Sequence, residues 1–159
     1  MRRYMYNVDI VPFHPDHVPM LKLRREVGGR FFENYDTWAK SITEIGKNNP
    51  TFTGFIGDKM IGFGGVSMIW TGVGEAWVCF DESMQHKPKV ILYYTKYMLD
   101  MIIKQNNLHR VQATCRIDFP QAASFLEHIG FELESVLHKF SEDGVDHFMY
   151  SMLPTKGAV

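Results

Sequence analysis

The chain has 159 residues, about the length of one domain, which leaves no room for a second domain of ordinary size. Apolar residues make up 45% of it, aromatic residues 14% and charged residues 22%, so a sizeable core is expected and a disordered charged tail is excluded. With 17 Lys and Arg against 18 Asp and Glu, the net charge is −1, which gives no overall field for a nucleic-acid backbone. We therefore expect one globular domain, residues 1–159, without general nucleic-acid binding.

Targeting and redox signals are few in this sequence. No apolar run approaches the roughly 20 residues of a membrane span, and the N-terminal residues lack the apolar stretch of a signal peptide. We expect a cytoplasmic protein without membrane contact. Cys79 and Cys115 are too few for a disulfide scaffold, and the seven histidines have no partner at metal-ligand spacing. The sequence therefore predicts free thiols and no metal site.

Apolar residues recur at strand spacing in some segments and at helix spacing in others, which predicts a mixture of both elements. The expected order is βααβββαβαββ, an α/β or α+β fold with a mixed, mostly antiparallel sheet and helices on both faces. The predicted strands cover residues 6–11, 51–56, 60–70, 75–80, 109–116, 132–140 and 145–153.

Capping residues mark where the four predicted helices begin and end. The starting residues are Pro15, Asp36, Pro88 and Asp118, the last of which forms a capping box with Gln121. The closing residues, each just past the end of its helix, are Gly28, Gly46 and Gly130. The pair Asp143-Gly144 predicts a tight turn between the last two strands.

A glycine-rich stretch lies inside the third predicted strand, at Gly62, Gly64 and Gly65. It resembles a phosphate loop only superficially, because no helix follows it and its spacing matches neither nucleotide-binding motif. We interpret it as a bulge or a close approach of two backbones.

Residues 108–132 carry a family resemblance. The strand from Leu108 to Arg116 leads into a short helix that ends in a Gly-Phe pair, and the matching residues are Ala122, Phe125, Gly130, Phe131 and Glu132. This order resembles the second half of the GNAT superfamily of N-acetyltransferases, and the element order agrees over nearly the whole chain. The resemblance implies an acyl-CoA-dependent N-acetyltransferase whose cofactor is acetyl-CoA.

The strand before the long helix reads Glu75 to Phe80, with Glu75, Trp77 and Cys79 on one face. In the histone-acetyltransferase-like branch, a Glu four residues before a Cys is the general base, and amides near the Cys bind the thioester. The resemblance therefore implies Glu75 as catalytic base and Trp77 beside the substrate, with the thioester held by Val78, Cys79 and Phe80. The alternative is that Glu75 begins the strand and faces water.

The family next has a loop of pattern Gln/Arg-x-x-Gly-x-Gly/Ala, whose amides bind the coenzyme A pyrophosphate. Here that loop runs from Gln85 to Val90, and the resemblance implies cofactor contacts for Gln85, His86, Lys87, Lys89 and Val90. Pro88 replaces the first glycine and removes an amide donor, and Val90 replaces the last small residue. Positive side chains would compensate for that donor, but a Lys/His cluster can also be simply solvated.

The short helix departs from the family too. Phe119 stands where the family has Asn, and is assigned to the cofactor site, while Leu126 replaces the Tyr that protonates the leaving thiolate. Ser124 or water would then supply that proton. These departures are similar to those of GNAT-like proteins encoded by bacteriophages, for which the location would be the host cytoplasm or the virion.

The resemblance also implies an acceptor pocket lined by the first two helices and the final hairpin. Glu33, His138 and His147 are the substrate-binding candidates there. The expected acceptor is an amine-bearing small molecule or protein, and the expected state a monomer or homodimer. A second function remains open, in which a GNAT-fold protein without turnover binds coenzyme A or another protein.

Overall fold

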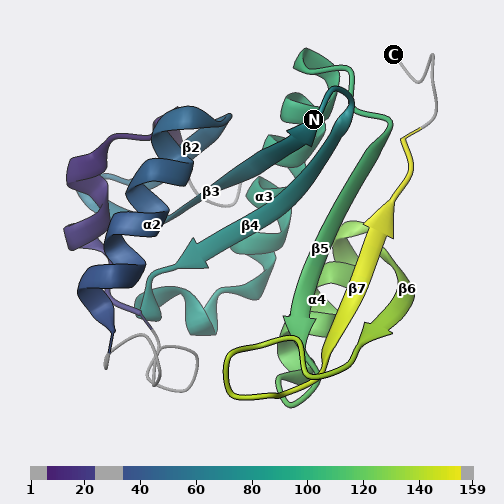
Figure 1. Ribbon diagram of the computed structural model, residues 1–159. Helices are drawn as coiled ribbons and strands as arrows, with labels where there is room; N and C mark the ends of the chain where they lie inside the picture. The colour runs from purple at the N-terminus through teal and green to yellow at the C-terminus, as the bar shows by residue number, and fades with distance from the viewer. Residues whose placement is uncertain (1–6, 24–33, 155–159) are drawn as a thin grey trace. The chain divides into compact units, whose positions relative to one another are not determined.

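The computed structural model describes residues 7–23 and 34–154 (Figure 1). Its strands are β1 (Val8–Pro12), β2 (Thr51–Ile56), β3 (Lys59–Trp70), β4 (Val73–Phe80), β5 (Arg110–Arg116), β6 (Glu132–Leu137) and β7 (His147–Met152). Its α-helices are α2 (Tyr35–Asn48), α3 (Pro88–Gln105) and α4 (Pro120–Ile129), and its 3-10 helices are η1 (Pro15–Met20) and η2 (Glu82–His86).

The strands form a sheet of order β1-β2-β3-β4-β5-β7-β6. β4 and β5 pair in parallel, whereas β1 with β2, β2 with β3, β5 with β7 and β6 with β7 pair antiparallel. The predicted α+β class with a mixed, mostly antiparallel sheet is confirmed. None of the helices in the described ranges has the length and hydropathy that crossing a bilayer requires.

The chain divides into two compact units. Unit 1 comprises Met1–Ser67 with Trp77–Tyr93, and unit 2 comprises Met68–Ala76 with Tyr94–Val159. β3, β4 and α3 each begin in one unit and end in the other. We describe each unit by itself.

The core of unit 1 is a cluster of buried apolar side chains, Val18, Leu21, Met60 and Phe63. Phe13 packs edge-on against Phe63, with ring centroids 5.4 Å apart. The Phe13 ring also lies against Gly46, where a Cβ atom would collide with it. Gly46 is therefore a packing residue inside α2, not the residue after its last turn that the sequence predicts.

The glycines of β3 permit a close approach of backbones, as predicted. A Cβ atom on Gly64 would lie 2.6 Å from the Trp77 carbonyl oxygen and 3.0 Å from the Val78 Cα atom. The pairing of β2 with β3 also shifts register between Gly54 and Phe55. The stretch is thus a sheet feature, and the predicted choice against a phosphate loop is confirmed.

The core of unit 2 lies on one face of β5, where alternate residues are buried. Val111, Ala113 and Cys115 are 0, 3 and 7% exposed. Tyr150 of β7 pairs with Ala113, and its hydroxyl donates to the Glu127 carboxylate of α4 at 2.9 Å. α4 therefore covers this face, and residues at even positions of β5 lie on the opposite one.

The N-terminal helix differs from its prediction within the described residues. η1 ends at Met20, and Leu21 has extended backbone angles, so no helix continues to Leu23. Pro19 lies inside η1 and has no N–H to extend it. Residues 24–33, including Gly28, lie outside the described part of the chain. α2 begins at Tyr35 after Asn34, one residue before the predicted Asp36 cap.

The predicted cap of α4 also differs from the structure. Phe119 is the N-cap of α4 and makes no side-chain cap, because the Asp118 carboxylate binds the Arg116 guanidinium instead. The predicted capping box is therefore wrong, although Gly130 does end α4 in a left-handed conformation.

The tight turn at Asp143-Gly144 forms as predicted: the Gly144 N–H donates to the Ser141 carbonyl oxygen at 2.8 Å, the Phe140 N–H donates to the Val145 carbonyl oxygen at 3.2 Å, and Gly144 is left-handed. The flanking strands are shorter than predicted, because β6 ends at Leu137 and β7 begins at His147.

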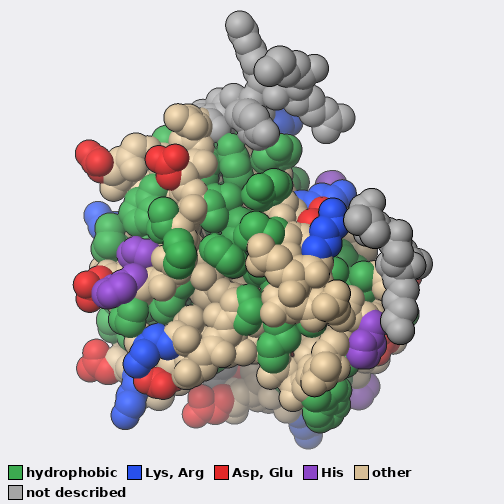
Figure 2. Space-filling view, turned by 90° about the horizontal axis from the view of Figure 1, so that it is seen from above, with side chains coloured by type: hydrophobic (Ala, Val, Ile, Leu, Met, Phe, Trp, Pro, Cys, Tyr) green, Lys and Arg blue, Asp and Glu red, His purple; other side chains and the backbone are tan. Residues whose placement is uncertain are grey.

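Figure 2 shows the molecule from above. Hydrophobic side chains gather on this face, and Lys and Arg side chains occur there only in small, separate groups.

Candidate functional site

In unit 1, the start of α3 gives the candidate phosphate site. α3 begins at Pro88, as predicted, two residues after η2 ends. The Lys87 N–H donates to the Met84 carbonyl oxygen at 3.0 Å, and Pro88 has no N–H. Lys89 and Val90 therefore provide the first-turn amides that have no partner inside the helix. Amides at such a helix end, with the helix dipole, stabilise an anion.

Side chains of one sign surround this helix start. His86, Lys87 and Lys89 are exposed, as is Gln85, and the first turn of α3 has no acidic residue. Val90 is 4% exposed, so its side chain belongs to the core and only its backbone is offered to a ligand. The two lysines lie at the positive end of the helix dipole, an arrangement that a bound anion would relieve.

Asp81 fixes the turn that leads to α3. It is 6% exposed, and its carboxylate accepts hydrogen bonds from the Lys22 N–H at 2.9 Å and the Ser83 N–H at 3.1 Å. Burial raises the pKa of Asp81, but the hydrogen bonds from Ser83 and Lys22 and the charge of Lys59 together hold it below its ordinary value. The position of Asp81 just past the end of β4 favours an exposed side chain, but the structure buries it as the N-cap of η2.

The end of β4 carries four predicted residues of unit 1. Val78 is 37% exposed, while Trp77, Cys79 and Phe80 are half-buried. The Trp77 ring packs edge-on against Phe63, and its indole N–H is buried without a hydrogen-bond partner among the described residues. Burial raises the pKa of the Cys79 thiol to about 12, so this thiol stays protonated at neutral pH.

Glu75 lies on the part of β4 that belongs to unit 2, and it is half-buried. Strand pairing places it in a row of four polar residues that crosses the sheet: Glu75, Gln112, Ser151 and Glu132. Directly paired residues point to the same side of a sheet. Glu75 and Gln112 are therefore neighbours on the face of β5 away from α4.

An ion pair supports this row. The Arg110 guanidinium donates to the Glu134 carboxylate at 2.8 and 2.9 Å, and its Nε donates to the Gln112 side-chain oxygen at 3.1 Å. The Arg110 hydrogen bond, with a further one from the Ser151 hydroxyl, lowers the pKa of Glu134 to about 2. The pair thus orders the side chains next to Gln112.

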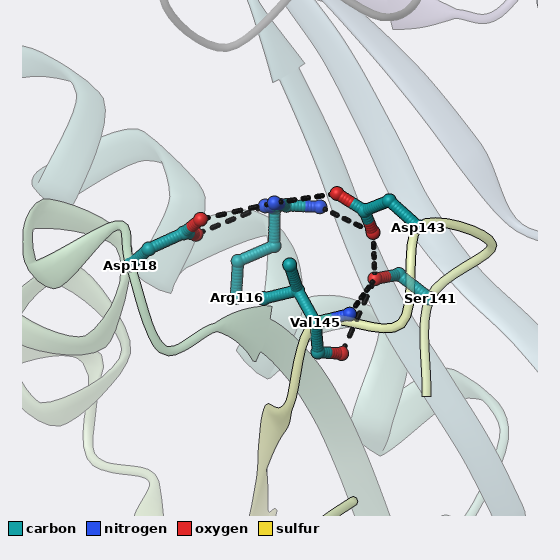
Figure 3. Close-up of polar contacts among 5 residues, drawn as sticks. All are labelled: Arg116, Asp118, Ser141, Asp143 and Val145. Carbon is teal, nitrogen blue, oxygen red and sulfur yellow. Dashed lines mark hydrogen bonds and ion pairs between the residues drawn. The ribbon is translucent and has the colours of Figure 1, made fainter. Parts of the chain in front are cut away.

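The loop between β6 and β7 is tied to the end of β5 by Arg116 (Figure 3). Its guanidinium donates to Asp118 at 2.9 and 3.0 Å and to Asp143 at 2.9 and 3.1 Å. Ser141 donates to Asp143 and accepts from the Val145 N–H at 3.2 Å. The two carboxylates occupy four of the five Arg116 donors, so this cluster holds the loop in place.

His147 lies beside this cluster, paired with Arg116 across the strands. Both ring nitrogens are buried and make no hydrogen bond to any part of the chain that the structure describes. Burial, and then the charge of Arg116, lower the pKa of His147, which favours the neutral ring. His138 is exposed, and its Nδ1 lies 3.1 Å from the Asp146 carboxylate.

The remaining predicted residues of unit 2 lie at α4. Phe119 caps the helix and is half-buried, and Ser124 is exposed. The His128 Nδ1 lies 2.7 Å from the Ser124 carbonyl oxygen, so it donates there and cannot accept the Ser124 hydroxyl proton. The Ser124 hydroxyl is therefore not activated by this histidine.

The predicted residues thus fall into two groups. Unit 1 contains residues 77–80 of β4 and residues 85–90, and unit 2 contains Glu75, Phe119, Ser124, His138 and His147. Glu33 lies outside the described residues. Gln112 and Arg110 were not identified from the sequence, because only strand pairing shows what they contact, whereas Asp81 carries the local signal of an N-cap residue.

The fold is similar to solved acetyltransferases. A GNAT-family acetyltransferase from Bacillus anthracis matches with a TM-score of 0.69 at 16% identity, covering 92% of this chain and 94% of that one. A ribosomal-protein-S5-alanine acetyltransferase from Vibrio fischeri matches at 0.69 and 18%, covering 97% of both chains. The microcin C7 self immunity acetyltransferase MccE, in complex with acetyl-CoA and AMP, matches at 0.70 and 14%, covering 92% of both.

The chain has the GNAT fold. The fold expected from the sequence is thereby confirmed. No protein-family model and no curated protein matches the chain by sequence. Sequence identities below a fifth establish a fold and not an activity.

Proposed function

We propose that the protein transfers an acetyl group from acetyl-CoA to the nitrogen of an amine. The observation that carries the proposal is the start of α3, in a chain with the GNAT fold. Two first-turn amides, of Lys89 and Val90, lie there beside exposed lysines and no acidic residue. These groups suit the pyrophosphate of coenzyme A, which brings negative charge to the positive end of a helix.

The fit of this helix start to a pyrophosphate is reduced at one position. Pro88 supplies no amide where a glycine would, so backbone contacts are fewer. Lys87, Lys89 and His86 offer charge in their place, and Gln85 offers an amide side chain. We propose that β4 completes the cofactor site with Val78, Cys79 and Phe80, and that Phe119 also contributes to it.

Direct attack by the amine is the mechanism that the cysteines favour. Burial raises the pKa of both Cys79 and Cys115, so neither forms the thiolate that an acetyl-cysteine intermediate requires. We assign Glu75 as the general base that takes the proton of the attacking amine. Glu75 precedes Cys79 by four residues in β4.

Ser124 or water would protonate the departing thiolate of coenzyme A. Ser124 is exposed, and its Oγ lies 3.4 Å from the His128 Nδ1. Because that nitrogen donates to the Ser124 carbonyl oxygen, the hydroxyl keeps its proton for the thiolate. We assign Glu33, Trp77, His138 and His147 to the acceptor, an amine-bearing small molecule or protein. We also propose that the protein is cytoplasmic and is a monomer or homodimer. We propose a single domain because β3, β4 and α3 run through both units.

Departures from the GNAT sequence pattern support a second function, binding without catalysis. Pro88 removes a phosphate donor, and Leu126 offers no hydroxyl where the family's acid would be. A protein of this kind would bind coenzyme A, or another protein, without turnover.

Calorimetric titration with acetyl-CoA, followed by thiol release with primary amines, tests the proposal. We expect binding, a rise in melting temperature by mass action, and turnover. Glu75→Gln should lower kcat by roughly 10² to 10⁴ with acetyl-CoA affinity nearly unchanged. Binding without turnover would favour the silent protein, and absence of binding at millimolar ligand would reject both.

A further inference from the structure

We propose that Gln112 holds a water molecule through which Glu75 takes the proton of the attacking amine. The inference rests on the proposed function and adds a residue to it. Gln112 would act through this water, as a positioning residue, and not on the acetyl group itself.

The register of β4 against β5 places Gln112 next to Glu75. β4 pairs with β5 in parallel, with Val73 opposite Arg110 and Glu75 opposite Gln112. Side chains of paired residues stand on one side of the sheet, with neighbouring strands about 4.8 Å apart. Both residues are half-buried, so they are neither sealed in the core nor fully in water. Gln112 is thus the lateral neighbour of Glu75 on β5.

Arg110 sets the orientation of the Gln112 amide. Arg110 is a donor only, so the Gln112 atom that it contacts at 3.1 Å must be the side-chain oxygen. Arg110 is itself held by two hydrogen bonds to Glu134. The NH2 group of Gln112 therefore remains as a donor on the same face as the Glu75 carboxylate, which only accepts.

A donor next to an acceptor recognises a molecule that both accepts and donates, and water is the smallest one. A water bound in this way accepts from Gln112, donates to Glu75 and has a second lone pair for the amine N–H. On attack, the amine nitrogen bonds to the acetyl carbon, the carbonyl π electrons move to the carbonyl oxygen, and the amine passes a proton to this water, which gives one of its own to Glu75. The water is regenerated, and Glu75 becomes a carboxylic acid. When the carbonyl re-forms, the C–S bond breaks, and the coenzyme A thiolate leaves and takes a proton from Ser124 or water.

The alternative assignment of His147 as the base is disfavoured by the same register. Arg116, which pairs with His147, lies four residues beyond Gln112 on β5, or about 13 Å. β7 is also the second strand from β4. His147 and Glu75 therefore cannot both contact one nitrogen atom.

Two variants distinguish the role of the Gln112 NH2 group, as a donor to the water, from that of its side-chain oxygen, which accepts from Arg110. Gln112→Glu keeps an oxygen for Arg110 but has no donor when ionised, whereas Gln112→Leu loses both. Thr114→Val is the matched control on the same face, two residues further along β5. We expect both Gln112 variants to lower kcat about ten- to a hundredfold, the effect of losing one hydrogen bond to a charged group, and the control to keep the wild-type rate.

The measurements are steady-state thiol release at saturating acetyl-CoA, with benzylamine, spermidine and an alanyl peptide as acceptors, and acetyl-CoA affinity by calorimetry. Affinity should be unchanged in each variant. If Gln112→Glu keeps the wild-type rate while Gln112→Leu does not, Gln112 only supports Arg110 and the inference is overturned. If Glu75→Gln keeps the rate, the proposed base is wrong and the inference fails with it.

A crystal structure tests the same point without turnover. We expect an ordered water within hydrogen-bond distance of the Gln112 nitrogen and the Glu75 carboxylate, lost in Gln112→Leu. A direct contact between these two side chains, with no water, would overturn the relay.

Discussion

The two units differ in how their histidines and carboxylates are hydrogen-bonded. In unit 1, the His17 Nδ1 lies 2.8 Å from the Thr53 hydroxyl, and the Asp81 carboxylate binds the Lys22 and Ser83 amides. In unit 2, both nitrogens of His147 have no partner in the described ranges, and the outer contacts are ion pairs of Arg110 and Arg116. His17 and Asp81 of unit 1 are thus bound within the fold, whereas the Trp77 indole N–H of unit 1 and the His147 ring of unit 2 keep hydrogen-bonding capacity that a ligand could use.

The largest effect should come from the close backbone approach in unit 1. Gly64→Val should destabilise the protein by about 3 kcal/mol or more, because its Cβ atom would lie 2.6 Å from a backbone carbonyl oxygen. Urea unfolding measures this. Gly144→Asn is the matched change in unit 2, where nothing lies within 4 Å and Asn accepts the left-handed backbone, so its stability should stay near the wild type. Equal losses would contradict the contrast between the units.

Replacing Asp81 should have the next largest effect on stability. Asp81→Ala leaves the Lys22 and Ser83 amides without their acceptor in a buried place, which should lower the free energy of unfolding by about 2 kcal/mol. Asp81→Asn keeps one oxygen acceptor and should lose less. Because the folded pKa of Asp81 is depressed, its contribution is present above the unfolded pKa and is lost as pH falls through the folded one. Unfolding at pH 7 and pH 3 checks both statements.

The two half-buried histidines sharpen the comparison through the pH dependence of stability. His17 and His147 both have a lowered pKa, mainly through burial, so stability is fully present above the ordinary value of about 6.5 and falls as the pH drops below it. His17→Phe should also lose about 1 kcal/mol at pH 7.5, because the Thr53 hydroxyl loses its partner. His147→Phe should be neutral or stabilising at that pH.

Both variants should show a smaller fall in stability between pH 7 and pH 5 than the wild type does. Denaturant midpoints at several pH values provide the measurement. A large loss for His147→Phe at pH 7.5 would mean that the ring nitrogens do have a partner in solution.

The smallest effect should come from the exposed ion pairs of unit 2. Asp118→Asn removes one carboxylate from Arg116 but leaves Asp143 in place. Since both residues reach solvent, the melting temperature should fall less than in Asp81→Asn, and the difference from wild type should shrink at 0.5 M salt. A fall in melting temperature that is larger than that of Asp81→Asn and does not depend on salt would show that the Arg116 ion pairs stabilise the fold more than exposed ion pairs do.

The sequence by itself determined the order of elements, the start of α3 at Pro88, the end of α4 at Gly130 and the glycine-rich strand, because these depend on local periodicity and on residues with special backbone properties. Only the tertiary structure decided the rest. Gly46 packs on Phe13, Asp118 binds Arg116 instead of capping a helix, and Gln112 lies beside Glu75 with its amide turned by Arg110. Each involves a partner from another part of the fold, and the choice among competing partners depends on strand register and burial, which no local spacing encodes.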